Sequence, residues 1–353
     1  MRPAYTLSVG DAMFRPGVDP DVLMRTFEGR EGTHTVPYIQ SSSDAEFRID
    51  FVDPELEIVE LELVHNGEIA AEGDLTPDNP ALAIMSLDDA DYDIIVRGFD
   101  EKEDGMFEHR IRSFGVGEVI AAIGDSLTEG YRGHAFRVQD LDITAANFPP
   151  ESVSTDGRNY PQYAPTAYQH WPEFNTMQSW LTDLNNLLSA SLKRPIFISN
   201  EGWGGITAGQ FLEMMKTDKD WQFRMQDLSP SLWLIHLGVN DMYADVPPAQ
   251  FIANLKELTK RLNGEYGAQP QDICIALPSH DTNEGMAAKN IAYCKALRPF
   301  IADNGFLVGP DFCAGFKDCY APLYTDFVHP NADGMRRMAQ LWHDALVAAF
   351  AKA

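Results

Sequence analysis

Apolar runs of strand length alternate with helical patterns from about residue 117 to the end of the chain. The runs are Glu118 to Ile123, Pro195 to Ser199, Ser231 to Leu237, Ile273 to Leu277 and Phe306 to Val308. Two of the intervening stretches carry apolar residues at helical spacing: Phe251, Leu255, Leu258 and Leu262 in one, and Ile291, Cys294, Leu297 and Ile301 in the other. Such alternation predicts an α/β fold, a parallel sheet covered by helices on both faces. Ligands bind such sheets at the carboxyl ends of the strands.

The first 115 residues have a different rhythm. Val59, Leu61 and Leu63 alternate with glutamates, which is the period of a half-buried strand. Asn66-Gly67 follows, a pair that favours the tight turn of a hairpin. Short strand-like runs recur through this half, and none of them has a helical period. We therefore expect an all-β sandwich over residues 1–115 and an α/β domain over residues 116–353.

The composition excludes several classes of partner. The chain has 353 residues, a hydrophobic content of 44%, a formal net charge of -26 and a pI near 4.5. So acidic a surface argues against nucleic acid and against an anionic membrane, because both partners require basic patches. A small-molecule or glycan ester is a more suitable substrate. The sequence leaves the oligomeric state open.

No apolar stretch approaches the length of a membrane-spanning helix, so we expect no membrane insertion. The N-terminus lacks the apolar core of a secretory signal, which favours the cytoplasm. A leader removed ahead of Met1 would leave the same sequence in a secreted or periplasmic protein. Cys313 and Cys319 are close enough in sequence to pair, and the sequence leaves that disulfide open. No cysteine pair has the spacing of a zinc site, and we expect neither a metal nor a cofactor.

Four polar segments follow the expected strands or precede the last helix. Gly124-Asp125-Ser126 follows the first strand, and Asn200 to Thr207 follows the second. Gly238-Val239-Asn240-Asp241 follows the third, and Asp326-Phe327-Val328-His329 precedes the final helix. The order of these segments is the one that acyl-transfer chemistry requires.

Each segment offers one group to that chemistry. The hydroxyl of Ser126 is a nucleophile only if a base takes its proton, and His329 is the candidate base. Asp326, three residues earlier, can orient the imidazole. An oxyanion needs fixed donors, and the candidates are the backbone N–H of Ser126, the backbone N–H of Gly205 and the side chain of Asn240.

These segments resemble the sequence blocks of the SGNH (GDSL-type) hydrolase superfamily. The family's serine, glycine and asparagine correspond to Ser126, Gly205 and Asn240, and its Asp-x-x-His corresponds to Asp326 and His329. The resemblance covers roughly residues 117–350. It implies a flavodoxin-like three-layer α/β/α fold and metal-free ester hydrolysis through an acyl-serine.

The chain departs from the family pattern in two places. Its N-terminal β half is additional, and it resembles the accessory β-sandwiches of some carbohydrate esterases. An aromatic-rich insertion covers residues 132–172. Tyr160 and Trp171 from this insertion, together with His280 after the fourth strand, are candidate substrate contacts, although packing of the loop explains the aromatic residues equally well. His236 lies inside an apolar run, which favours a histidine of the core.

The sequence therefore predicts a serine esterase acting on short acyl esters, with deacetylation of a carbohydrate as the preferred reaction. A lipase-like or thioesterase activity on longer acyl chains is an alternative. A carbohydrate-binding protein without catalysis on the same scaffold is an alternative of another class.

Overall fold

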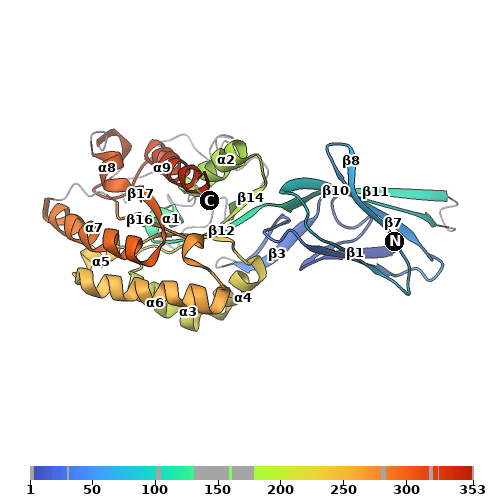
Figure 1. Cartoon of the computed structure of the whole chain (residues 1–353), viewed down its shortest axis with the longest axis horizontal. Coiled ribbons are helices and arrows are strands. Elements are labelled where there is room, and N and C mark those ends of the chain that lie inside the picture. Colours follow the sequence, from blue (N-terminus) through green and yellow to red (C-terminus); the bar gives the residue numbers. More distant parts are fainter. Residues whose placement is uncertain are drawn as a thin grey trace. The chain divides into compact units, whose positions relative to one another are not determined.

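A computed structural model gives the structure of the chain (Figure 1). It describes residues 4–29, 32–100, 105–130, 159–160, 179–279, 284–317, 321–324 and 326–351. The chain forms two compact units. The first contains Met1–Glu28, Gly32–Glu118 and Arg194–Ile196, and the second contains Gly29–Glu31, Val119–Lys193 and Phe197–Ala353. The domain boundary expected between residues 115 and 116 stays a prediction.

The first unit is built from strands. A four-stranded sheet has the order β2-β1-β6-β9, and a five-stranded sheet has the order β5-β11-β10-β7-β8. The bounds in the first sheet are β1 Tyr5–Val9, β2 Ala12–Phe14, β6 Ala45–Phe51 and β9 Ala81–Ile84. Those in the second are β5 Ile39–Gln40, β7 Val59–His65, β8 Glu68–Leu75, β10 Ala90–Asp100 and β11 Gly105–Val116. A separate two-stranded sheet pairs β3, Met24–Gly29, with β4, Gly32–Pro37.

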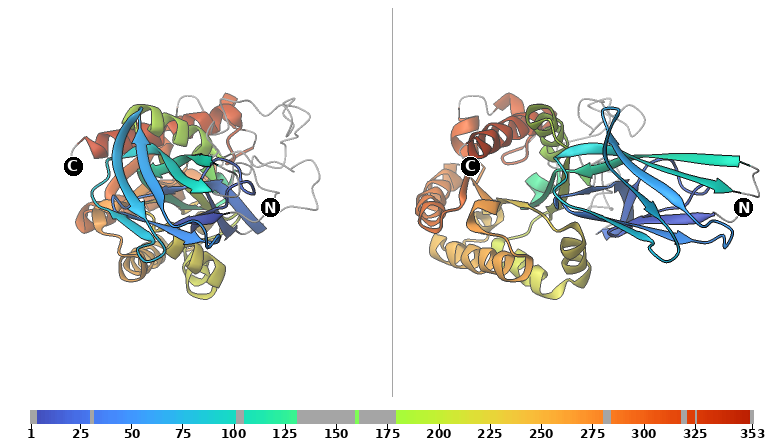
Figure 2. Two further views of the ribbon diagram at one scale, coloured as in Figure 1. Left: turned by 90° about the vertical axis from the view of Figure 1, so that its right-hand side faces the viewer. Right: turned by 45° about the vertical axis from the view of Figure 1, so that its right-hand side comes forward.

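One hydrophobic core draws on both of the larger sheets. Leu7 and Phe47 come from the four-stranded sheet, and Leu61, Val96 and Phe114 come from the five-stranded sheet. Across this core the rings of Phe47 and Phe114 meet edge to face, with centroids 5.1 Å apart. Figure 2 shows the two layers of strands. Alternate residues of β6 point inward, as the period of a half-buried strand predicts, and the expected sandwich is confirmed.

The turn between β7 and β8 also follows the prediction. Asn66 and Gly67 both have positive φ, 51° and 84° respectively, which is the conformation of a tight hairpin turn. The second strand of this hairpin is β8, although its small and charged side chains show no clear alternation of burial.

The second unit contains a six-stranded sheet of order β13-β14-β12-β15-β16-β17. The pairs β13–β14, β12–β15, β15–β16 and β16–β17 are parallel. The strands are β12 Glu118–Gly124, β13 Asn159–Tyr160, β14 Ile196–Gly202, β15 Leu232–His236, β16 Ile273–Leu277 and β17 Leu307–Asp311. The interior strands β12, β15 and β16 are almost entirely buried, as helical cover on both faces requires.

Helices cover both faces of this sheet. Helices α2 and α9 pack together on one side, and α3 packs on α6 on the other side (Figure 1). The helices are α1 Ser126–Glu129, α2 Trp180–Leu192, α3 Ala208–Thr217, α4 Lys219–Leu228, α5 Val239–Tyr243, α6 Pro248–Tyr266, α7 Glu284–Asn304, α8 Phe312–Phe316 and α9 Ala332–Phe350. The described residues of this unit also include the short 3-10 helices Pro270–Asp272 and Ala321–Leu323. The expected α/β/α fold is confirmed.

The predicted buried face of α7 is wrong at one position, Ile291. Ile291 of α7 is 66% exposed, whereas Cys294, Leu297 and Ile301 are buried as predicted. Asn290 takes the inward position, where its Nδ2 donates to the carbonyls of Pro278 and Ser279. The backbone carbonyls of the loop after β16 thus receive their hydrogen bonds from Asn290, which is buried in place of Ile291.

Within the described residues, no helix combines the length and the apolar character that crossing a membrane would require.

Candidate active site

Ser126 is the first residue of α1, directly after the end of β12. Asp125 caps this short helix, and its Oδ1 accepts a hydrogen bond from the N–H of Leu127 at 3.0 Å. The residue before Asp125 is Gly124. A side chain does not fit at this position, because a Cβ there would lie 2.0 Å from Thr128 Oγ1. The sharp passage from strand to helix therefore fixes the position of the serine at the carboxyl end of the sheet.

His329 lies beside Ser126 although the two are 203 positions apart in the chain. The Oγ of Ser126 is 3.1 Å from Nε2 of His329. On the other side of the ring, Nδ1 is 2.9 Å from Asp326 Oδ2. An ionised carboxylate can only accept, so Nδ1 carries the proton and the lone pair of Nε2 faces the serine hydroxyl. This is the tautomer that a general base for Ser126 requires.

Asp326 is held in its ionised form by its own loop. Burial alone would raise its pKa, but the hydrogen bond and charge of His329 and two backbone donors outweigh burial and lower the pKa to about 2. Those donors are the N–H groups of Val328 and His329, at 2.9 and 2.8 Å from Oδ1. The spacing of three residues lets one turn supply the orienting carboxylate, its hydrogen-bond donors and the histidine.

Gly205 lies in the loop between β14 and α3. Its φ is +76°, in the left-handed region that favours glycine, and a Cβ there would meet no heavy atom within 4 Å. The loop is held next to the serine, because the N–H of Trp203 donates to the carbonyl of Gly124 at 3.0 Å. Thr207 then caps α3 in a capping box with Gln210.

Asn240 is in the first turn of α5, after β15. Its Nδ2 donates to the carbonyl of Ile206 at 3.1 Å, so the amide holds the loop that contains Gly205. An amide NH2 has two protons, and the second can serve an oxyanion. The structure thus joins Ser126, His329 and Asp326 by direct hydrogen bonds, and it joins the loops of Gly205 and Asn240 to each other.

The candidate substrate contacts are largely untested. Trp171 and His280 lie outside the described residues, as does most of the aromatic insertion at 132–172. The backbone of Tyr160 belongs to β13 and pairs with Ser199 of β14, but its side chain is not among those described. Cys319 also lies outside the described part, so whether it pairs with Cys313 stays open.

His236 is a core residue, as expected. It is 1% exposed, and its ring packs on that of Phe312 with centroids 4.7 Å apart. Its Nε2 lies 3.2 Å from the hydroxyl of Ser279. Burial lowers the pKa of His236 to about 3, so the ring is neutral.

The sequence analysis did not single out two aromatic residues on the candidate catalytic loops. Trp203 is 38% exposed and lies two residues before Gly205. Phe327 is 65% exposed and lies between Asp326 and His329. Both residues could have been noticed in the sequence, because each is a large aromatic residue inside a motif that also contains a candidate catalytic or oxyanion residue.

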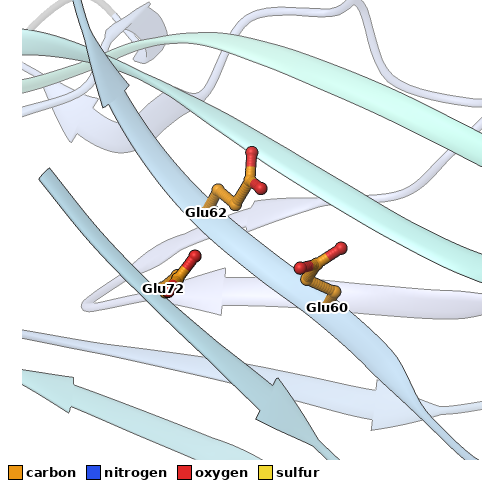
Figure 3. Close-up of side chains that lie close together, drawn as sticks. All are labelled: Glu60, Glu62 and Glu72. Carbon is orange, nitrogen blue, oxygen red and sulfur yellow. The ribbon is translucent and has the colours of Figure 1, made fainter. Parts of the chain in front are cut away.

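A separate group of acidic side chains occurs in the first unit. Figure 3 shows Glu60 and Glu62 of β7 beside Glu72 of β8, and their carboxylate oxygens lie within 4.8 Å of one another. The guanidinium of Arg97 lies 2.6 Å from Glu62 and 3.6 Å from Glu60. This arginine supplies positive charge to the cluster, which is therefore explained as part of an ion-pair network across β7 and β10.

Part of the chain matches the model of a known protein family. The model of the GDSL-like lipase/acylhydrolase family matches residues 122–337, which is more than half of the chain. This segment contains all five candidate catalytic and oxyanion residues. A comparison with curated proteins found no match.

Solved structures of similar fold include an acetylxylan esterase from Geobacillus stearothermophilus. It is 17% identical, with a TM-score of 0.44 over 66% of this chain and 94% of the esterase. An alpha/beta hydrolase from the metagenome of Lake Arreo, Spain, is 20% identical, with a TM-score of 0.44 over 67% of this chain and 95% of that enzyme. Similarity at this level carries no information about the substrate. The match over residues 122–337 shows that the chain is a hydrolase of the GDSL-like lipase/acylhydrolase family, as the resemblance to SGNH hydrolases predicted.

Proposed function

We propose that the protein is a serine esterase that removes short acyl groups, with acetyl groups on a carbohydrate as the preferred substrate. The observation that carries the proposal is the continuous line of hydrogen bonds from Ser126 through His329 to Asp326, at 3.1 and 2.9 Å. A serine hydroxyl facing an imidazole lone pair, with a carboxylate behind the ring, is the arrangement that acyl transfer uses.

Acylation begins when Ser126 Oγ attacks the ester carbonyl and His329 Nε2 takes the hydroxyl proton. The imidazolium that forms is stabilised by the ionised Asp326. The N–H groups of Ser126 and Gly205 and the second amide proton of Asn240 stabilise the negative oxygen of the tetrahedral intermediate. His329 then returns its proton to the leaving alcohol, and the acyl group remains on Ser126.

Deacylation repeats these steps with water as the nucleophile. His329 takes a proton from water, the same donors stabilise the second tetrahedral intermediate, and the acid leaves as Ser126 regains its proton. His329 must be neutral at the start of both halves, because only the neutral ring can accept a proton at Nε2.

The nature of the substrate rests on charge and on exposed aromatic side chains. A net charge of -26 disfavours anionic substrates and is compatible with neutral esters. Trp203 and Phe327 present aromatic surface on the loops that contain Gly205 and His329. Aromatic faces stack on the apolar faces of sugar rings, which favours a glycan as the alcohol part of the ester.

The test of the function is hydrolysis of p-nitrophenyl esters from acetyl to long acyl chains, with Ser126→Ala beside the wild type. We expect turnover of short chains by the wild type only. Turnover that persists in Ser126→Ala would contradict the proposed nucleophile. Failure of the wild type with both p-nitrophenyl and acetylated sugar esters would instead favour a binding protein without catalysis.

A preference for long acyl chains is the second candidate. The high exposure of Phe327, 65%, favours it, because an apolar side chain beside His329 can contact an acyl chain as readily as a sugar ring. The same ester series separates the two activities: a rate that increases from acetyl to longer chains assigns the lipase-like activity, and a rate that decreases assigns the short-chain esterase.

The role of the aromatic residues is tested with Trp203→Ala on two acetates. We expect KM for an acetylated methyl xyloside to rise about 10-fold, from the loss of a stacking contact, while kcat/KM for methyl acetate changes less than about 3-fold. Phe223→Ala is the control, because Phe223 is an exposed aromatic residue, 59%, on α4 rather than on a candidate catalytic loop. Equal effects on both acetates would contradict a sugar contact at Trp203.

A further inference from the structure

Two aspartates lie in the interior of the second unit, beneath the candidate catalytic loops. Asp125 and Asp241 are both 0% exposed. Asp125 Oδ1 accepts from the N–H of Leu127 and so anchors the turn that presents Ser126. Asp241 Oδ2 accepts from the N–H of Ala208 at 2.9 Å and so anchors the end of the Gly205 loop. Each carboxyl group therefore holds one of the two loops that meet at the serine.

Each aspartate also has one oxygen that the rest of the structure leaves unsatisfied. Asp125 Oδ2 and Asp241 Oδ1 have no hydrogen-bond partner in the part of the chain that the structure describes, and neither carboxyl forms an ion pair there. A buried carboxylate with a bare oxygen is costly, and two of them near each other are more costly still. Carboxyl groups in this situation relieve the cost by keeping a proton.

The surrounding charges favour Asp125 as the group that keeps the proton. Burial, followed by the negative charges of Asp241 and Glu129, raises the pKa of Asp125 to about 7, although the bond from Leu127 opposes the rise. Burial also raises the pKa of Asp241. On the side of β15, the backbone carbonyl of His236 lies against Gly124, and the His236 ring is neutral. It supplies no positive charge that would favour an ionised Asp125.

A protonated Asp125 needs an acceptor for its O–H group. Asp241 Oδ1 is a buried acceptor without a partner among the described residues. A proton held between Asp125 Oδ2 and Asp241 Oδ1 would satisfy both atoms at the same time. Oδ1 of Asp125 stays free to accept from Leu127 in either protonation state.

We propose that Asp125 and Asp241 are positioning residues that carry one negative charge between them, with the proton on Asp125, and that they keep the Ser126 turn and the Gly205 loop in register. The proposal rests on the proposed esterase function for its catalytic readout. Its other readouts are independent of catalysis.

The decisive comparison is Asp125→Asn against Asp125→Ala. Asparagine caps a helix as well as aspartate and carries N–H donors where the acid carries its O–H, so it imitates the protonated form. We expect Asp125→Asn to retain kcat for p-nitrophenyl acetate within about 3-fold at about pH 6. Asp125→Ala, which loses both the cap and the donor, should lower kcat at least about 10-fold with little change in KM.

Thermal unfolding separates the proposed proton from a merely structural role, because a structural role alone would not make the Tm difference between variant and wild type depend on pH. A folded pKa above the unfolded value means that the folded state binds the proton more tightly, so the contribution of Asp125 to stability is lost as pH rises between about 4 and 7. Asp125→Asn has no such proton to lose. We therefore expect the Tm of the variant relative to that of the wild type to increase by about 3 °C or more from about pH 5 to about pH 8.

Infrared spectroscopy of the wild type decides the protonation state even if a variant fails to fold. We expect a carboxylic acid C=O band at about pH 6 that shifts on aspartate isotope labelling and is absent from Asp125→Asn. No such band, or a Tm difference that does not change with pH, would overturn the proposal. So would a kcat for Asp125→Asn as low as that of Asp125→Ala. If the wild type hydrolyses no ester, the proposed function fails, but the Tm and infrared results still determine whether Asp125 is protonated.

Discussion

At the scale of single residues, several side chains of the candidate site have two tasks. Asp326 accepts from the imidazole of His329 and from two N–H groups of its own turn. Asn240 uses one amide proton to hold the carbonyl of Ile206 and has a second that we assign to the oxyanion. Replacing either residue should therefore disturb its loop as well as remove a group from the proposed chemistry.

Asn240→Ala should lower kcat about 10²- to 10³-fold, which corresponds to the loss of one oxyanion donor. Asn263→Ala is the matched control, since Asn263 Nδ2 also donates to a backbone carbonyl, that of Ala268 at 2.9 Å, at the end of α6. Steady-state kinetics of both variants on p-nitrophenyl acetate provide the measurement. Full activity in Asn240→Ala would show that the amide does not serve the oxyanion.

Asp326 should make stability depend on pH in a definite direction. Its folded pKa of about 2 lies below the ordinary value, so its contribution is present above about pH 4 and is lost as pH falls toward 2. The difference amounts to about 2 kcal/mol, which Asp326→Asn removes. Denaturant unfolding of both proteins at several pH values should therefore give curves that converge on acidification, and a gap that stays constant would contradict the assignment.

At the scale of elements, the site is a set of loops held by the ends of parallel strands. The strand ends could be predicted from the sequence because apolar runs such as Ile273 to Leu277 stop abruptly at polar residues. The order of the motifs along the chain then predicted which loops would meet. The contact between the loops of Trp203 and Gly124 could not be predicted, because it is a backbone hydrogen bond that no side chain encodes.

The left-handed conformation of Gly205 offers a test with an internal control. Gly205 and Gly267 have φ of +76° and +73°, and a Cβ at either would meet no heavy atom within 4 Å. Alanine at each position should thus cost a similar strain, about 1–2 kcal/mol. Only Gly205→Ala should also lower kcat, since its N–H is the proposed donor, and Gly267 ends α6 away from the loops. An equal loss of kcat in both variants would point to general destabilisation instead.

Helix faces show where reasoning from periodicity stops. In α6 the four apolar residues that the pattern selected, Phe251, Leu255, Leu258 and Leu262, are all buried as predicted. In α7 a polar residue, Asn290, takes the inward place that the pattern gave to Ile291. Its partners are backbone carbonyls of Pro278 and Ser279 in the loop after β16, and a pattern of hydrophobicity carries no information about them.

At the scale of the whole molecule, charge is the property that the sequence states most directly. The net charge of -26 should repel anionic substrates, and added salt should weaken that repulsion by screening the charges. We expect kcat/KM for 4-acetoxybenzoate to rise about 3- to 10-fold between about 0.02 and 0.5 M NaCl, and that for uncharged phenyl acetate to change less than about 2-fold. The same response for both esters would mean that the charges lie too far from the site to act on the substrate.

Both architectures could be predicted because each has its own pattern of apolar residues. In the β half, apolar residues recur at every second position. In the hydrolase half, apolar runs of strand length alternate with stretches of helical spacing. The buried carboxyl groups were not predicted as a pair. Asp125 and Asp241 lie in separate motifs, and only the fold brings the negative charge of one to bear on the other. Burial of charged groups is a property of the assembled structure, and local sequence does not reveal it.

The central claim is that His329 activates Ser126. The most direct measurement is the rate at which a fluorophosphonate modifies the protein, with the modified peptide identified by mass spectrometry. Ser126 should be the modified residue, Ser126→Ala should not react, and His329→Ala should react at least about 10³-fold more slowly than the wild type. Modification of another serine, or an unchanged rate in His329→Ala, would contradict the claim.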